Sequence, residues 1–218
     1  MPRTSWRRRE RTELTRIRPA PAAGVRESEL RPESGDPFAV DLTEEAREGL
    51  SFQVYAPEPP IQGVRSYPLR KHRAENGWFC EMYRLQDGEL RLGGEVPPFP
   101  VRQVSVSYAA PGRVNAFHIH PRAPQNELWC VVEGQLLVWL VDCRADSSSR
   151  GVRQRVVLSA ESPGLLHIPA GVAHGYRAGR EGALLMYAMD QQFDPSNPNE
   201  GRLPWDHFGA DLWEEDRG

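Results

Sequence analysis

The sequence contains few cysteines, no long apolar run and little net charge. Its 218 residues include three cysteines, Cys80, Cys130 and Cys143, and no two of them have the C-x-x-C spacing of a metal or redox motif. This small, odd number predicts free thiols in a reducing compartment, so we expect a cytoplasmic protein. No stretch approaches about 18 consecutive apolar residues, which argues against a membrane span. A formal net charge of −3 provides no basic surface for nucleic acid.

Long helical patterns are also absent, and the composition changes near residue 63. Eight of the twenty prolines fall within the first 60 residues, among charges of both signs. We therefore predict that residues 1–63 form an N-terminal extension that is partly flexible or wrapping. A short helix is predicted over 41–50, beginning near Thr43. Residues 64–218 are predicted to form one barrel domain with a C-terminal tail.

Within residues 64–218, short apolar runs alternate with glycine, proline, asparagine and aspartate. This pattern is typical of an antiparallel sandwich or barrel, not of alternating strands and helices. We predict an all-β fold, an antiparallel jelly-roll β-barrel, with Gly134 turning the chain between two of its strands. The predicted strands are 78–83, 89–92, 101–108, 114–120, 127–132, 135–141, 153–158, 165–168 and 184–189.

One constellation of polar residues is expected inside this barrel. His118 and His120 share one face of a strand, because successive side chains point to opposite faces. Glu127 opens the next strand, and antiparallel pairing would bring its carboxylate back toward the two rings. His174 follows a turn at Pro169 and re-enters the sheet. We predict that the three histidines and the glutamate converge.

Such a set is suited to a metal ion. Three imidazoles and one carboxylate from separate strands, here His118, His120, His174 and Glu127, suit Mn, Fe, Ni, Cu or Zn, with positions left open for substrate. Each imidazole would bind in its neutral form, its other nitrogen held by a neighbouring acceptor. The alternative is a metal-free site in which the histidines form ordinary hydrogen bonds.

Several segments resemble the dTDP-4-dehydrorhamnose 3,5-epimerases, which belong to the cupins. The segments are GWFCE at 77–81, QVSVS at 103–107, the run 136–144 and PAGVAHGY at 169–176, within a resemblance that covers about 64–213. It implies a dimeric enzyme that needs no cofactor and moves protons at the carbons beside the 4-keto group of a nucleotide-linked sugar. In that reading His118 is the catalytic base and Tyr187 the acid. The implied substrate-binding residues are Glu81, Gln103, Asn115 and His174.

The sequence departs from the family's pattern at positions that the resemblance assigns to substrate binding and catalysis. Asn115 and Asn76 stand where the family has arginines, and Glu127 stands where it has a lysine. His120 replaces what is usually an amide. The family's aspartate that partners the base comes from a late C-terminal segment, for which Asp206, Asp211 and Asp216 are the candidates here.

Three functions follow as hypotheses. The first is a carbohydrate epimerase or isomerase acting on a keto-sugar, possibly nucleotide-linked, by proton abstraction and return. The second is a metal-dependent cupin enzyme, a dioxygenase or an isomerase that uses the metal as a Lewis acid. The third is a non-catalytic sugar-binding cupin. In each case we expect a homodimer whose ligand is a small sugar or sugar nucleotide, with no nucleic-acid or membrane partner.

Overall fold

The computed structural model describes residues 38–52, 59–91 and 98–215. The chain divides into two units, residues 1–55 and 56–218. In the first unit, helix α1 (Glu44–Gly49) begins after Thr43, whose Oγ1 accepts a hydrogen bond from the backbone N–H of Ala46 at 3.3 Å. This cap confirms the helix predicted near Thr43. In the described part of the chain, no helix is long and apolar enough to cross a membrane.

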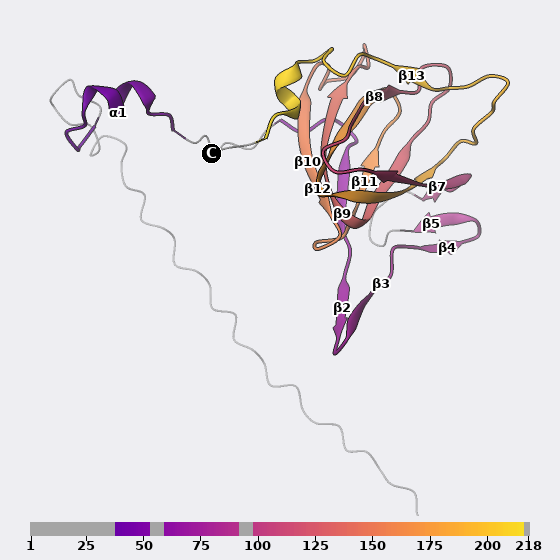
Figure 1. Ribbon diagram of the computed structural model, residues 1–218. Coiled ribbons are helices and arrows are strands. Elements are labelled where there is room, and N and C mark those ends of the chain that lie inside the picture. The colour runs from indigo at the N-terminus through magenta and orange to yellow at the C-terminus, as the bar shows by residue number, and fades with distance from the viewer. Residues whose placement is uncertain (1–37, 53–58, 92–97, 216–218) are drawn as a thin grey trace, which may run out of the picture. The chain divides into compact units, whose positions relative to one another are not determined.

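The second unit is built around two long antiparallel strands, β9 (Glu127–Asp142) and β12 (Val172–Met189). They pair along almost their whole length, from Val172 opposite Asp142 to Met189 opposite Glu127. Further strands extend the sheet on both sides and curve it into a barrel, as Figure 1 shows. These strands are β1 (Arg65–Pro68), β7 (Gln103–Ala109), β8 (Val114–Ile119), β10 (Arg153–Ser159), β11 (Gly164–Ile168) and β13 (Gly201–Arg202). The predicted antiparallel jelly-roll barrel is therefore confirmed.

The two long strands differ from the sequence prediction. Strands 127–132 and 135–141 are one strand, so the predicted turn at Gly134 is wrong. Gly134 instead bends β9 where it passes β12: its φ is +71°, and a Cβ there would lie 2.0 Å from the carbonyl oxygen of Gly182. The first half of β12, up to residue 183, was not predicted as a strand. Glycines that approach a neighbouring backbone so closely permit a continuous bent strand in place of a turn.

The barrel is held by three apolar clusters. One packs inside and includes Trp129, Val131, Val138 and Leu185. The two others pack elsewhere on the sheet. A short 3₁₀ helix, Ala210–Trp213, covers one of these with Leu212 and Trp213. Ile61 is 1% exposed and belongs to the inner cluster, so the barrel packing begins just before residue 64.

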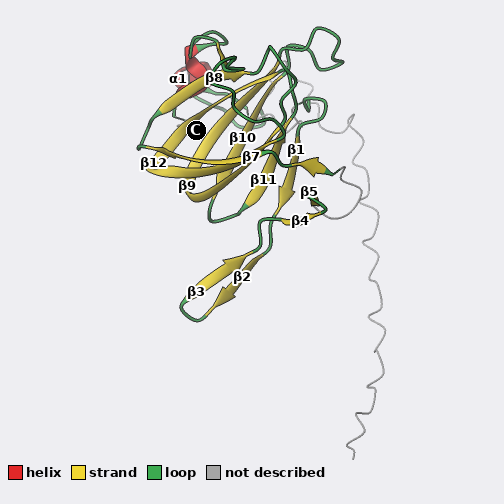
Figure 2. Cartoon of the chain, turned by 90° about the vertical axis from the view of Figure 1, so that its right-hand side faces the viewer, coloured by secondary structure: helices red, strands yellow, loops and turns green. Residues whose placement is uncertain are grey.

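Two small sheets lie outside the barrel. Strands β2 (Lys71–Ala74) and β3 (Gly77–Cys80) form a hairpin that projects away from it (Figures 1 and 2). Strands β4 (Arg84–Gln86), β5 (Glu89–Arg91) and β6 (Phe99–Pro100) form the other, which packs on the barrel through a cluster of Leu90, Phe99, Leu128 and Ala188. All three cysteines are free, as their number predicts.

Candidate active site

The predicted polar residues meet where β8, β9 and β12 approach one another. Glu127 is the first residue of β9, and His174 is the third residue of β12. His118 lies in β8 directly opposite His174, and His120 follows the end of that strand. The ring centroid of His174 is 6.1 Å from that of His118 and 5.5 Å from that of His120. The expected shared face of His118 and His120 is therefore present.

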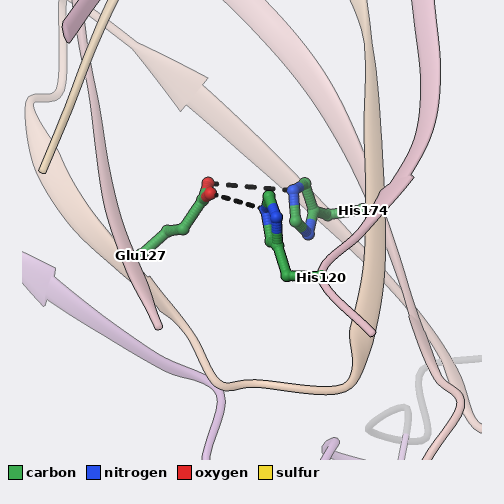
Figure 3. A group of neighbouring side chains, drawn as sticks. All are labelled: His120, Glu127 and His174. Carbon is green, nitrogen blue, oxygen red and sulfur yellow. Dashed lines mark ion pairs between the residues drawn. The ribbon is translucent and has the colours of Figure 1, made fainter. Parts of the chain in front are cut away.

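Three of these residues form a compact group. The Nε2 atom of His120 lies 2.9 Å from Oε1 of Glu127, and the Nε2 atom of His174 lies 3.7 Å from Oε2 of the same carboxylate. Figure 3 shows this carboxylate pointing at both rings. One donor atom from each of the three residues lies within 4.8 Å of the other two. All three side chains are buried.

Neighbouring groups fix the orientation of each member. The Nδ1 atom of His120 lies 2.6 Å from the carbonyl oxygen of Asn199, and the Nδ1 atom of His174 lies 3.0 Å from that of Val172. The carboxylate of Glu127 is held from two further sides. The indole N–H of Trp129 donates to Oε2 at 2.6 Å, and the side-chain amide of Gln125 donates to Oε1 at 2.9 Å.

His118 lies beside this group but is not one of the three residues that compose it. Its Nδ1 atom is 3.4 Å from a carboxylate oxygen of Glu200. Its Nε2 atom is buried and has no hydrogen-bond partner among the described residues. The acidic residue facing His118 is thus Glu200, which the sequence prediction missed. Of the three aspartates considered for this role, Asp216 lies outside the described residues, and the structure records no ion pair between Asp206 or Asp211 and His118.

The four groups titrate differently because of what surrounds them. Burial, followed by the neighbouring charges of His174, Arg202 and His120, lowers the pKa of His118 to about 4. Burial also lowers the pKa of His174. Burial opposes charge on His120 as well, but the hydrogen bond and negative charge of Glu127 outweigh it and raise the pKa of His120. Burial would raise the pKa of Glu127, yet the adjacent His174 and His120 lower it to about 2.

Tyr187 and Gln103 lie on the paired strands β12 and β7. Tyr187 on β12 lies between Ser105 of β7 and Trp129 of β9. Burial, and next the charge of Glu127, raises the pKa of the Tyr187 phenol, while a hydrogen bond with Ser105 acts in the opposite direction. The amide of Gln103 donates to Oγ of Ser105 at 3.1 Å. Ser105 therefore lies next to both the amide of Gln103 and Tyr187.

The other two predicted substrate-binding residues, Asn115 and Glu81, lie in different parts of the structure. Asn115 is half-buried: it donates to the hydroxyl of the buried Tyr176 at 3.3 Å and accepts from the exposed Arg202 at 3.2 Å. Glu81 follows the projecting hairpin, is exposed, and pairs with Arg84 at 2.8 Å. The structure records no contact between Glu81 and the histidines within the described residues.

Comparisons with known proteins agree with this architecture. The model of a family described as dTDP-4-dehydrorhamnose 3,5-epimerase matches residues 58–212. The chain is 36% identical over 147 residues to the spore coat polysaccharide biosynthesis protein SpsL of Bacillus subtilis (strain 168), a match that covers 67% of this chain and 91% of the relative. It is 28% identical over 149 residues to the probable low-salt glycan biosynthesis epimerase Agl13 of Haloferax volcanii, covering 68% of this chain and 90% of the relative.

The fold of the chain also matches that of a solved structure. The crystal structure of a dTDP sugar isomerase from Desulfovibrio desulfuricans G20 superimposes with a TM-score of 0.57 at 26% sequence identity, over 72% of this chain and 91% of that one. The family match extends over more than half of the chain and contains every predicted site residue. The chain belongs to the dTDP-4-dehydrorhamnose 3,5-epimerase family of carbohydrate epimerases.

Proposed function

We propose that this epimerase acts on a nucleotide-linked keto-sugar, with His118 removing a proton from a carbon beside the ketone and Tyr187 returning one from the opposite face of the ring. The observation that carries this assignment is the buried Nε2 atom of His118, which has no partner among the described residues. A nitrogen with a free lone pair in the barrel interior is what proton abstraction requires.

The surroundings of both groups support these roles. Glu200 faces the Nδ1 atom of His118, so the ring's proton is held there and Nε2 is left as the base. Ser105 lies opposite Tyr187 on the neighbouring strand, where its hydroxyl can orient the phenol. Proton removal leaves negative charge on the ketone oxygen, which needs a donor aimed at it. Arg202 is one candidate, because its charge acts on His118 and its guanidinium bonds to Asn115.

The sugar itself would be held by residues around these two. We assign Gln103, Asn115 and His174 to substrate binding. Asn115 lies on β8 with the base, His174 lies on β12 with the acid, and Gln103 lies on β7, which pairs with β12. Glu81 remains a prediction from the family resemblance alone. The nucleotide part of the substrate is supported by the names of the relatives, which include a dTDP sugar isomerase.

Deuterium uptake tests the proposal. A dTDP-linked 4-keto-6-deoxyhexose incubated with the protein in heavy water should gain deuterium at the carbons beside the ketone. His118→Gln and Tyr187→Phe should each slow epimerisation by ~10²–10⁴-fold, the usual contribution of one general acid or base. His167→Gln and Tyr108→Phe, which alter residues remote from the proposed chemistry, serve as matched controls. Absence of uptake with the wild-type protein would favour the non-catalytic sugar-binding alternative.

A metal-assisted reaction is the second candidate, and one observation favours it: the compact group of His120, Glu127 and His174. A chelator distinguishes this metal-assisted reaction from the metal-free reaction proposed first. If the reaction depends on a metal, treatment with a chelator abolishes deuterium uptake, whereas pure acid–base catalysis by His118 and Tyr187 continues unchanged.

A further inference from the structure

The proposed function gives no role to His120 and Glu127, which form a compact group with His174. These three side chains are buried and direct their polar atoms at one another. We infer that they form a binding site for one divalent first-row transition metal ion. Two imidazole nitrogens and a carboxylate are a donor set that such ions bind well, and positions would remain open for a further ligand.

The distances suit such an ion. Nitrogen and oxygen ligands lie about 2.0–2.2 Å from zinc, so two neighbouring ligand atoms are roughly 3–3.5 Å apart. In this structure Glu127 lies 2.9 Å from the nitrogen of His120 and 3.7 Å from that of His174. The widest separation in the group does not exceed 4.8 Å. An ion bound between them would take the place of the hydrogen bond that the amide of Gln125 now makes to Oε1 of Glu127.

The hydrogen bonds at the far side of each ring match those of metal ligands. Both Nδ1 atoms face backbone carbonyl oxygens, of Asn199 and Val172, which accept hydrogen bonds and cannot donate them. Each ring therefore carries a proton at Nδ1 and directs its Nε2 atom at Glu127. The Nε2 atom of His120 also lies 3.3 Å from the side-chain amide nitrogen of Gln125. Histidines that bind metals usually donate their other N–H to a carbonyl or carboxylate in this manner, which fixes both the tautomer and the ring orientation.

A metal-free network accounts for this arrangement less well. His120 can donate a proton from Nε2 to the carboxylate of Glu127 and form an ion pair. His174, whose proton is engaged with Val172, then presents a lone pair to the second oxygen of the same carboxylate. The Nε2 atom of a neutral His174 and Oε2 of Glu127, which also accepts from Trp129, are then two acceptor atoms 3.7 Å apart. A cation between His174 and Glu127 removes this conflict.

The donor set also limits which ions fit. Calcium and magnesium prefer oxygen ligands, so two imidazoles disfavour both of them. Zinc, iron(II), manganese and cobalt accept mixed nitrogen and oxygen ligands. A bound ion of this kind would supply positive charge close to His118, where a sugar ketone could be polarised. This last role rests on the proposed function, but binding of the ion does not.

The inference is tested by metal binding to the full chain in the absence of any sugar. Protein stripped with a chelator is dialysed against Zn²⁺ or Co²⁺, and bound metal is measured by elemental analysis. We expect about one ion per chain in the wild type, visible absorption bands typical of nitrogen- and oxygen-bound Co²⁺, and a higher melting temperature with metal. Glu127→Gln and His120→Gln should each weaken binding at least ~10-fold.

A control variant and a titration of the wild-type protein show whether the metal binds at this group of residues. His167→Gln removes another barrel histidine whose Nδ1 faces a backbone carbonyl, that of Gly63 at 2.9 Å, and should leave the bound metal unchanged. The Co²⁺ titration of the wild type needs no variant, so it decides the question even if the substituted proteins fail to fold. Wild-type protein that takes up no more metal than Glu127→Gln would overturn the inference. Metal binding without deuterium uptake would instead contradict only the proposed epimerisation.

Discussion

At the scale of single residues, His118 is distinguished from its neighbouring histidines by what its ring nitrogens face. The nitrogens of His120 and His174 all have a polar neighbour, whereas Nε2 of His118 has no hydrogen-bond partner in the described part of the chain. The group opposite Nδ1 of His118 is the carboxylate of Glu200, at 3.4 Å. In the proposed mechanism, a carboxylate in that position orients the ring and stabilises the imidazolium formed when His118 takes up a proton.

Replacement of Glu200 tests that relationship. Glu200→Gln keeps the size of the side chain but removes its charge, so we expect kcat to fall ~10–100-fold with little change in KM. The loss should be smaller than that of His118→Gln, because Glu200 acts through the ring. Glu133→Gln, an exposed acid elsewhere on β9, is the matched control. An unaltered kcat in Glu200→Gln would show that His118 works without this partner.

Part of this site could be predicted from the sequence. The alternation of β8 places His118 and His120 on one face, and antiparallel pairing brings Glu127 and His174 to them. Glu200 could not be predicted, because it lies on the irregular segment before β13 and no local pattern connects it to β8. The position of Glu81, where the structure records no contact with the histidines, could not be predicted either, because no sequence pattern shows that the β2–β3 hairpin projects from the barrel.

At the scale of secondary-structure elements, β9 and β12 show what local sequence patterns can and cannot predict about strands. Nearly all the predicted strand segments are present, because short apolar runs between turn residues are a strong signal. The strand prediction was wrong at Gly134, because a glycine can either end a strand in a turn or bend a continuous strand. Gly134 has the positive φ of a turn residue, but its role is to let β9 pass close to Gly182. A sequence does not reveal whether a glycine ends a strand or bends it.

The end of β9 is held by a buried carboxylate. Asp142 is 1% exposed and accepts hydrogen bonds from the side chains of Arg144, Ser147 and Ser149. The hydrogen bond from Arg144 is the largest contribution to a pKa of Asp142 that lies well below its ordinary value. The ionised form is therefore the one that the folded state prefers, and the loop from 143 to 152 depends on it.

This arrangement predicts a pH-dependent stability. Because the pKa of Asp142 is lower in the folded than in the unfolded chain, its contribution is complete above the unfolded value of about 4 and is lost as the pH falls toward the folded value. Asp142→Asn should lower the free energy of unfolding at pH 7 by about 1.5–3 kcal/mol, the range for hydrogen bonds to a charged group. Urea melts at pH 7 and pH 3 measure the difference, which should shrink at pH 3.

Asp146→Asn provides the comparison for Asp142→Asn. Asp146 lies in the same loop but is exposed, so its replacement should change the stability by no more than about 0.5 kcal/mol at either pH. If Asp142→Asn destabilised the protein equally at pH 7 and pH 3, the lost interaction would not be that of the ionised carboxylate.

At the scale of the whole molecule, the barrel exposes an apolar row on β7. This strand pairs with β12 on one side and has no other strand partner among the described residues. Its residues alternate, so that Gln103 and Ser105 face inward while Val104, Val106 and Tyr108 are 46%, 56% and 63% exposed. Apolar side chains gathered on an edge strand are typical of surfaces that a second protein surface covers.

We predict that this row lies in the interface of a homodimer. Light scattering of the wild-type protein should give twice the 24.6 kDa of one chain. Val106→Asp places a charge in the centre of the row and should weaken dimerisation at least ~10-fold, since burying an unpaired carboxylate is costly. Val157→Asp is the control, because Val157 is 55% exposed on β10 and lies outside the row. Both variants should keep the strand-dominated circular dichroism spectrum of the wild type. A wild-type mass of one chain at high protein concentration, or equal effects of the two substitutions, would contradict the assignment of β7 to the interface.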